Sequence, residues 1–145
     1  MPDEIGLGVL LFVPYREMER RVFAALAEAG HELTPAQARL LARIADDGSR
    51  VTDLAESAQI TKQTAGYLVD QLERAGYVER VLDPTDARAR LVRFTARAEA
   101  ARPVADAATA AVEAEWLAHL GPRRYTALRD ALTRLRPITD PYLDS

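Results

Sequence analysis

The chain has 145 residues, of which 48% are hydrophobic and 28% charged, and it contains no cysteine. This length suits one domain and leaves no room for a catalytic domain beside a regulatory one. The lack of cysteine excludes thiol catalysis, thiolate metal sites and cysteine redox sensing. No apolar run approaches the roughly 18 residues of a membrane span, and Asp3 and Glu4 stand where a signal peptide would be basic, so we expect a cytoplasmic protein.

The formal net charge of −3 is unevenly distributed along the chain. Residues 61–98 hold seven Arg and Lys against five Asp and Glu, whereas the segments on both sides are net negative. One positive stretch in an acidic chain is expected when a single edge of the protein meets phosphates. Alone, the charge pattern does not define a function.

The first predicted element is a one-sided helix. Apolar residues recur at steps of three and four from Leu11 to Leu26, which predicts a helix that ends near Gly30. Two glycines and Pro14 in its first half predict a kink or a late start. The apolar run 9–13 needs burial, which a partner chain would supply.

Two shorter helices follow. The sequence Thr34-Pro35-Ala36-Gln37 offers a cap, a first-turn proline and a capping-box glutamine, so the second helix is predicted to start at Pro35. It is predicted to stop at Asp46-Asp47-Gly48. Thr52 is then expected to cap a short helix through Leu54 and Ala58.

The next helix is capped by Thr61 and ends at Gly76. One narrow arc of its helical wheel is apolar and is the predicted buried face: Ala65, Leu68, Val69 and Leu72. The opposite, polar side carries Gln63, Tyr67, Asp70 and Arg74, with Lys62 and Gly66 on its flank.

Segments 77–81 and 90–95 are rich in β-branched and aromatic residues, and they predict two strands. Asp83-Pro84-Thr85-Asp86 between them has turn chemistry, because proline fixes φ and aspartate can accept bonds from nearby amides. The unit is therefore a predicted hairpin.

The C-terminal part is predicted to be helical. After Thr95 the chain is alanine-rich and predicted to be helical to about Leu120, and Pro103 either bends this helix or marks its true start. Gly121-Pro122 opens a last helix, which Pro137 closes.

A short helix, a tight turn, a capped amphipathic helix and a hairpin form a winged helix-turn-helix. The predicted fold class is therefore α+β, mostly α. In this arrangement the first residues of the capped helix are aimed at a DNA major groove.

Several segments carry a resemblance to one family: LTPAQ at 33–37, LAE at 54–56, LVDQLERAGYVER at 68–80, DPTDAR at 83–88 and FT at 94–95. The pattern resembles the MarR family of bacterial winged-helix transcription regulators, and it covers residues 33 to about 99. The resemblance implies a homodimer, with residues 1–32 and 99–145 as dimerisation helices and 33–98 as the DNA-binding lobe. It also implies a pseudo-palindromic double-stranded DNA operator, usually repression, and release by a small aromatic or phenolic effector.

The resemblance assigns roles to individual residues. Those that match the groove-facing start of the recognition helix are Thr61, Lys62, Gln63, Thr64 and Tyr67. Arg88 matches the wing-tip arginine and Asp86 the acid that steadies it. Arg74, on the outer helix face, and Arg90, on the hairpin, complete the candidate DNA-binding set. For Arg80 and Arg93, phosphate contact and a plain solubility role stay equally open.

The sequence departs from the family pattern at three places. Gln59 stands where the family often has glycine, so a non-glycine residue is expected to adopt a left-handed conformation in the turn. The usual pair of wing arginines is reduced to Ala87-Arg88. Gly66 lies inside the recognition helix, where it costs roughly 1 kcal/mol relative to alanine or permits close approach to DNA.

Two further sites, an effector pocket and a metal site, have fewer residues that indicate them. An effector pocket is implied between the first, second and fifth helices and the lobe, with Phe12, Tyr15, Met18, Leu41 and Trp116 as candidates, although plain core packing is the alternative. Glu115 and His119 lie four apart, and His31 and Glu32 could add ligands, but two lone histidines favour surface roles over a metal site.

No cofactor is expected, because no glycine-rich phosphate loop is present. The serines lack the partners of a nucleophile, so an enzyme is not expected. A winged-helix module for protein interaction or ligand binding, without operator binding, stays open because the central segment is only weakly basic.

Overall fold

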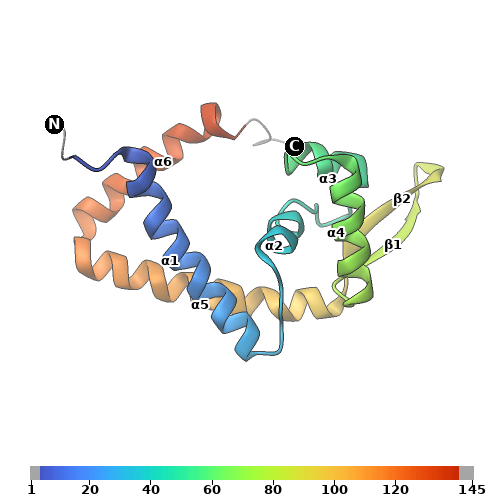
Figure 1. Cartoon of the computed structure of the whole chain (residues 1–145), viewed down its shortest axis with the longest axis horizontal. Helices are drawn as coiled ribbons and strands as arrows, with labels where there is room; N and C mark the ends of the chain where they lie inside the picture. Colours follow the sequence, from blue (N-terminus) through green and yellow to red (C-terminus); the bar gives the residue numbers. More distant parts are fainter. Residues whose placement is uncertain (1–3, 141–145) are drawn as a thin grey trace. The chain divides into compact units, whose positions relative to one another are not determined.

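The computed structural model describes residues 4–140. Its elements are α1 (Leu7–Glu28), α2 (Pro35–Leu41), α3 (Val51–Ser57), α4 (Lys62–Arg74), β1 (Val78–Asp83), β2 (Asp86–Phe94), α5 (Ala96–Leu120) and α6 (Pro122–Thr139) (Figure 1). The fold is mostly helical with a two-stranded antiparallel wing, which confirms the predicted class.

The chain divides into two compact units. Among the described residues, one unit comprises 33–102, here called the winged lobe, and the other comprises 4–32 and 103–140, here called the helical unit. Helix α5 passes from one unit into the other at Pro103, within a continuous helix. The outer ends of the predicted dimerisation segments, 1–3 and 141–145, lie outside the described residues.

The winged lobe is built around the apolar face of α4. Its four buried residues are Ala65, Leu68, Val69 and Leu72, the set that the helical wheel predicts. Helices α2 and α3 and strand β1 all pack on α4. Buried residues from the neighbouring elements complete this core: Leu40, Leu54, Tyr77, Val78 and Val92. The polar side of α4 is thereby left outward.

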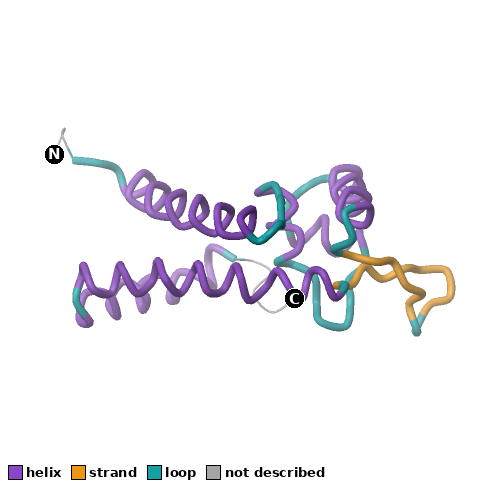
Figure 2. Tube along the Cα trace, turned by 90° about the horizontal axis from the view of Figure 1, so that it is seen from below, coloured by secondary structure: helices purple, strands orange, loops and turns teal. Residues whose placement is uncertain are grey.

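The wing is a hairpin longer than the sequence predicts. Strand β1 continues to Asp83 and β2 begins at Asp86, four residues before the predicted start, so the turn is reduced to Pro84 and Thr85. Figure 2 shows the two strands projecting from the helices of the lobe. Ser49 adds a short bridge to Val92, with N···O distances of 2.8 and 2.9 Å, and so ties the α2–α3 loop to the wing.

In the helical unit, α1 lies beside α5, as both Figure 1 and Figure 2 show. Arg21 of α1 forms an ion pair with Glu115 of α5. Arg129 of α6 lies 3.7 Å from Glu113 of α5. The unit leaves many large apolar side chains exposed, on α1 and the segment before it (Ile5, Leu7, Val9, Leu10, Leu11, Phe12, Val13) and on α6 (Leu128, Leu132, Leu135, Ile138).

Two expectations about prolines are settled by the helix bounds. Helix α1 begins at Leu7 with Pro14 inside it, so of the two alternatives the late start is wrong and the kink stays a prediction. The prediction that Pro137 closes the last helix is wrong, because Pro137 lies inside α6, which continues to Thr139. In each case the proline removes only one backbone donor from a long helix, which is a smaller loss than breaking the helix. The alanine-rich helix also starts at Ala96, before Pro103.

Two predicted helix ends near the helix-turn-helix were also wrong. Helix α2 ends at Leu41, well before Asp46, because the amides of Arg43 and Ile44 turn to carbonyls only three residues back. Helix α3 begins at Val51 with Arg50 as its N-cap, so Thr52 lies within the helix and does not cap it. The predicted caps Thr34 and Thr61 are confirmed, with the complete capping box at Thr34 and Gln37.

Candidate nucleic-acid interface

The first turn of α4 presents polar groups at a helix N-terminus. The Thr61 side-chain oxygen accepts from the Thr64 amide at 3.0 Å, and the two hydroxyls are 2.8 Å apart. Residues 61–64 are all exposed, including the side chains of Lys62 and Gln63. Free amides and the positive end of the helix dipole make such a turn attractive to phosphate.

The turn before α4 is closed by Gln59. This residue has a φ of 57°, which confirms the expected left-handed conformation of a non-glycine residue. The Gln59 amide donates to the Glu56 carbonyl at 3.1 Å, and the Ile60 amide donates to the Ala55 carbonyl at 3.0 Å. These carbonyls at the end of α3 therefore have hydrogen-bond donors, and the turn fixes the direction in which α4 begins.

Tyr67 lies one turn further along the same face of α4. Its side chain is 59% exposed, and its hydroxyl oxygen accepts a hydrogen bond from Gln71 at 3.0 Å. A Cβ atom built on Gly66, the preceding residue, meets nothing within 4 Å. Packing within the protein therefore does not require glycine at this position.

The base of the wing tip is held by Asp83, which is 7% exposed. One carboxylate oxygen accepts from the Thr85 amide and hydroxyl at 2.8 and 2.7 Å, and the other accepts two bonds from the Arg50 guanidinium at 3.1 and 2.7 Å. The Thr85 amide, its hydroxyl and Arg50 together lower the pKa of Asp83 from 3.8 to about 2. Asp83 therefore joins the start of α3 to the wing.

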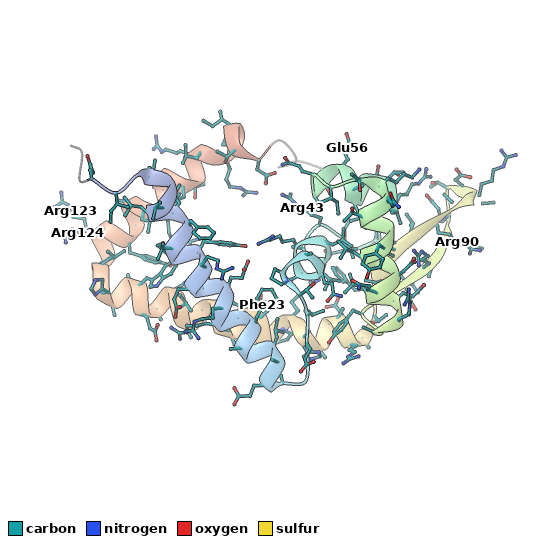
Figure 3. All side chains as sticks on the ribbon, in the orientation of Figure 1. Phe23, Arg43, Glu56, Arg90, Arg123 and Arg124 are labelled. Atoms are coloured by element: carbon teal, nitrogen blue, oxygen red, sulfur yellow. The ribbon has the colours of Figure 1, made fainter. Side chains whose placement is uncertain are left out.

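Asp86 holds the backbone of Arg88. Its carboxylate accepts from the Arg88 amide at 2.9 Å, and its other oxygen lies 3.8 Å from the Arg50 guanidinium. Within residues 4–140 no ion pair joins Asp86 to the Arg88 side chain. The expected contact with the guanidinium is thus replaced by a backbone contact. Arg88 and Arg90 are both exposed, and Figure 3 shows Arg90 projecting from the hairpin.

Two of the hairpin arginines are occupied within the lobe. Arg80 bonds to Asp70 and Glu73 of α4, each at 2.7 Å, and Arg93 bonds to Glu79 across the hairpin at 2.7 Å. These pairs favour the structural reading of Arg80 and Arg93 over phosphate contact. Arg74 is exposed at the last residue of α4, about 18 Å along the helix from Lys62.

The candidate effector residues fall into both units. Phe12 and Tyr15 of α1 are exposed, and Met18 and Trp116 are half-buried, all in the helical unit. Leu41, the last residue of α2, is half-buried in the winged lobe. The Tyr15 hydroxyl donates to Glu19 at 2.8 Å. The pocket itself stays a prediction.

No group of three or more potential metal ligands is found among residues 4–140. Glu115, considered above as a ligand, forms an ion pair with Arg21. In the same described range, no helix combines the length and apolar character needed to cross a membrane.

Arg50, Gln37 and Gln71 are structural contributors to the site that sequence reasoning missed. Nothing in the sequence distinguishes Arg50 from other cations, and its partner Asp83 lies 33 residues away. Gln37 is recognisable as a capping residue, but its contact with Gln71 joins two helices that only the fold brings together.

Comparisons with known proteins agree with this geometry. Residues 31–89 match the profile described as the MarR family. A Mycobacterium tuberculosis MarR family protein, solved in complex with salicylic acid, is 29% identical, with 93% of this chain and 99% of that chain covered and a TM-score of 0.67. Wild-type MarR from E. coli is 21% identical, with 92% and 98% covered and a TM-score of 0.72. An S. aureus MepR mutant bound to an oligodeoxyribonucleotide is 21% identical, with 91% and 96% covered and a TM-score of 0.62.

No curated protein matches the chain at a significant level. The fold and the polar face of α4 define a winged helix-turn-helix DNA-binding protein. Residues 31–89 match the MarR family, and the chain is similar over most of its length to a MarR family protein; it is a DNA-binding transcriptional regulator. Members of this family regulate transcription and are not enzymes.

Proposed function

We propose that two copies of this chain bind a pseudo-palindromic operator in double-stranded DNA and repress transcription there. The observation that carries the proposal is the exposure, on one lobe, of the first turn of α4 and of the wing cations Arg88 and Arg90. Cations and polar donors from a helix N-terminus and a hairpin are the groups that contact phosphates and base edges.

Each element has a distinct part in this proposal. The first turn of α4 enters the major groove, where Gln63 pairs with an adenine by two hydrogen bonds. Arg88 enters the flanking minor groove, whose negative potential favours a guanidinium. In a symmetric pair, the two recognition helices lie about one DNA turn apart, on the order of 34 Å.

The proposed dimer forms through the helical unit. Apolar side chains along α1 and α6 are exposed in the single chain, among them Leu10, Phe12 and Leu132. An apolar surface of this extent on helices is typical of an interface between subunits. A second copy of the chain is the occupant that the two-fold symmetry of an operator requires.

The proposed effector is a small aromatic or phenolic acid. Support comes from the Mycobacterium tuberculosis relative, which was solved with salicylic acid. Phe12, Tyr15, Met18, Leu41 and Trp116 remain the candidate contacts. Binding of the effector would lower operator affinity by changing the spacing of the two recognition helices.

Fluorescence anisotropy tests the DNA part of the proposal. The full chain is titrated against labelled DNA from upstream of its own gene, over a series of salt concentrations and with and without salicylate. Saturable binding that weakens steeply with salt is expected, because phosphate contacts release counterions. Absence of binding at low salt would instead favour a winged-helix module for protein or ligand binding.

A reporter assay tests the sign of regulation. The upstream region is fused to a reporter gene, and expression is compared in cells with and without the chain. Repression predicts higher expression when the chain is absent. Lower expression would identify an activator.

A further inference from the structure

A continuous series of hydrogen bonds runs from the start of α2 to the exposed face of α4. The Thr34 amide donates to Gln37 Oε1 at 3.0 Å, Gln37 Nε2 donates to Gln71 Oε1 at 3.2 Å, and Gln71 Nε2 donates to the Tyr67 hydroxyl at 3.0 Å. Gln37 and Gln71 are half-buried, whereas Tyr67 is exposed. We call this series the glutamine relay.

The direction of the glutamine relay is fixed at its first member. A backbone N–H can only donate, so Gln37 must turn its oxygen toward Thr34 and its NH₂ group toward Gln71. Gln71 must then accept with its oxygen, which leaves its own NH₂ group facing Tyr67. The Tyr67 oxygen is therefore an acceptor inside the protein, and its O–H hydrogen is free to donate outward.

We propose that Gln37 and Gln71 are positioning residues that make Tyr67 a hydrogen-bond donor toward DNA. Tyr67 would then select an acceptor in the DNA, either a phosphate oxygen or an acceptor atom on a base edge in the major groove. This inference rests on the proposed function, because it assumes that the exposed face of α4 lies against the operator.

The variant Gln37→Glu reverses the relay without removing the cap. Glutamate also serves at this position of a capping box, so one carboxylate oxygen still accepts from Thr34. The other oxygen can only accept, so the Gln71 amide turns over and presents its oxygen to Tyr67. The hydroxyl hydrogen is then used inside the protein, and Tyr67 no longer donates to DNA.

The expected result is a loss of operator affinity of about tenfold, similar to that of Tyr67→Phe. Anisotropy titrations then compare two double variants that carry the same added charge. The variant with Gln37→Glu and Tyr67→Phe should bind the operator no more weakly than the variant with Ala36→Glu and Tyr67→Phe. If Tyr67 donates to a phosphate, Tyr67→Phe weakens binding to all sequences alike. If it donates to a base, the loss is confined to the operator.

Ala36→Glu is the matched control, since it adds the same charge at the neighbouring, exposed position of the same first turn without entering the relay. The change in operator affinity caused by Ala36→Glu measures the repulsion between the added charge and DNA. This change should be the same in the wild-type chain and in Tyr67→Phe. Gln37→Met breaks the relay without adding charge. It should lower operator affinity in a chain that has Tyr67 and have no effect in Tyr67→Phe. Thermal unfolding of each variant checks that the lobe is folded.

The inference is overturned if Gln37→Glu weakens binding no more than Ala36→Glu, or weakens it equally when the Tyr67 hydroxyl is absent. In both cases wild-type binding is intact, so the proposed function stands. If the wild-type chain itself shows no saturable, salt-sensitive binding to upstream DNA, both the proposed function and this inference fail.

Discussion

Asp83 determines the geometry of the wing through four hydrogen bonds from two partners, Thr85 and Arg50. Because those donors stabilise the charged carboxylate, the folded protein lowers its pKa from 3.8 to about 2. A lowered pKa means that the folded state is favoured when this carboxylate is charged. Its contribution to stability is therefore complete above pH 3.8 and is lost as the pH falls through about 2.

The substitution Asp83→Asn should lower the thermal midpoint at neutral pH, because the Arg50 guanidinium loses its hydrogen-bonded carboxylate and keeps only the more distant Asp86. Circular dichroism melts as a function of pH should show a constant difference from wild type above about pH 5, shrinking toward pH 2. Thr85→Val, which removes only one donor from the same carboxylate, should give a smaller difference with the same pH dependence. A difference that does not change with pH would contradict this account.

Arg88 and Gln63 are predicted to act on DNA in different ways. Arg88→Ala should weaken binding by a similar factor for all sequences and reduce the salt slope, because it removes a phosphate or minor-groove cation. Gln63→Ala should cost about 1–3 kcal/mol on the operator and relax its sequence preference. Gel-shift titrations on operator and scrambled DNA separate the two effects.

The control for this pair is Arg93→Ala, whose side chain is bonded to Glu79 across the hairpin. If Arg93 is structural, its loss should change affinity less than the loss of Arg88. If neither Arg88→Ala nor Gln63→Ala alters operator binding, the assignment of these residues is wrong.

At the scale of the element, α4 combines a confirmed cap and buried face with a glycine in its middle. Glycine lowers helix stability because of its backbone entropy. A Cβ on Gly66 would meet nothing within 4 Å, so the folded lobe has room for alanine. The cost of this glycine is therefore not offset by any packing within the lobe.

Gly66→Ala should raise the free energy of unfolding by about 0.5–1 kcal/mol, as measured by urea denaturation. The matched control is Gly48→Ala: Gly48 has a φ of +99°, and a Cβ there would lie 3.1 Å from the Leu91 Cβ, so this variant should be destabilised. Equal effects at the two positions would contradict the argument. Operator titrations of Gly66→Ala then test whether DNA approaches the helix closely at this point.

The features of this lobe that sequence alone predicts are those encoded by neighbouring residues. The caps at Thr34 and Thr61 and the buried arc of α4 follow from local patterns, whereas the left-handed Gln59 was expected from the resemblance, which has glycine there. Contacts between distant elements were not predictable in this way. Arg50 became the cap residue of α3 in place of Thr52, and its side chain bonds to Asp83 in the wing.

At the candidate site, sequence identified the exposed polar residues of α4 but not their internal partners. Arg80 and Arg93 could not be assigned from sequence, because their acids lie on another element or across the hairpin. Asp86 was correctly placed beside Arg88, yet it bonds to the amide and not to the guanidinium. Spacing in a strand locates a residue without determining which atom its side chain meets.

For the whole molecule, we expect from the exposed apolar side chains of the helical unit that operator affinity depends on formation of the dimer. Leu10→Asp places a charge at a position that is 53% exposed in the single chain. We expect sedimentation velocity to show a monomer, and operator affinity to fall by more than 100-fold, because one half-site alone is bound weakly. Thermal unfolding of the variant should still show a cooperative transition, which checks that the winged lobe remains folded.

A control for that substitution is Arg123→Asp, an exposed residue at the start of α6 that Figure 3 labels. It introduces the same aspartate at a polar position and should leave the dimer intact. Dimers in both variants would show that the apolar surface of α1 is not the interface.

The ion pairs within residues 61–98 also limit how many cations of that segment can reach DNA. Of the basic residues in 61–98, Arg80 and Arg93 are paired with acids and Arg97 stacks 4.5 Å above the Tyr77 ring. Lys62, Arg74, Arg88 and Arg90 remain exposed in the single chain. If these supply the phosphate contacts of a dimer, the slope of log affinity against log salt should be no steeper than about −7.

The small number of exposed cations has a consequence inside a cell, where non-specific chromosomal sites vastly outnumber any one target site. Attraction to arbitrary sequence grows with each neutralised phosphate, so this regulator should be held only briefly at incorrect positions. Most of its discrimination must then come from the few side chains that contact base edges. A single base change in the target would therefore displace a larger share of the bound molecules than it would for a strongly basic homologue.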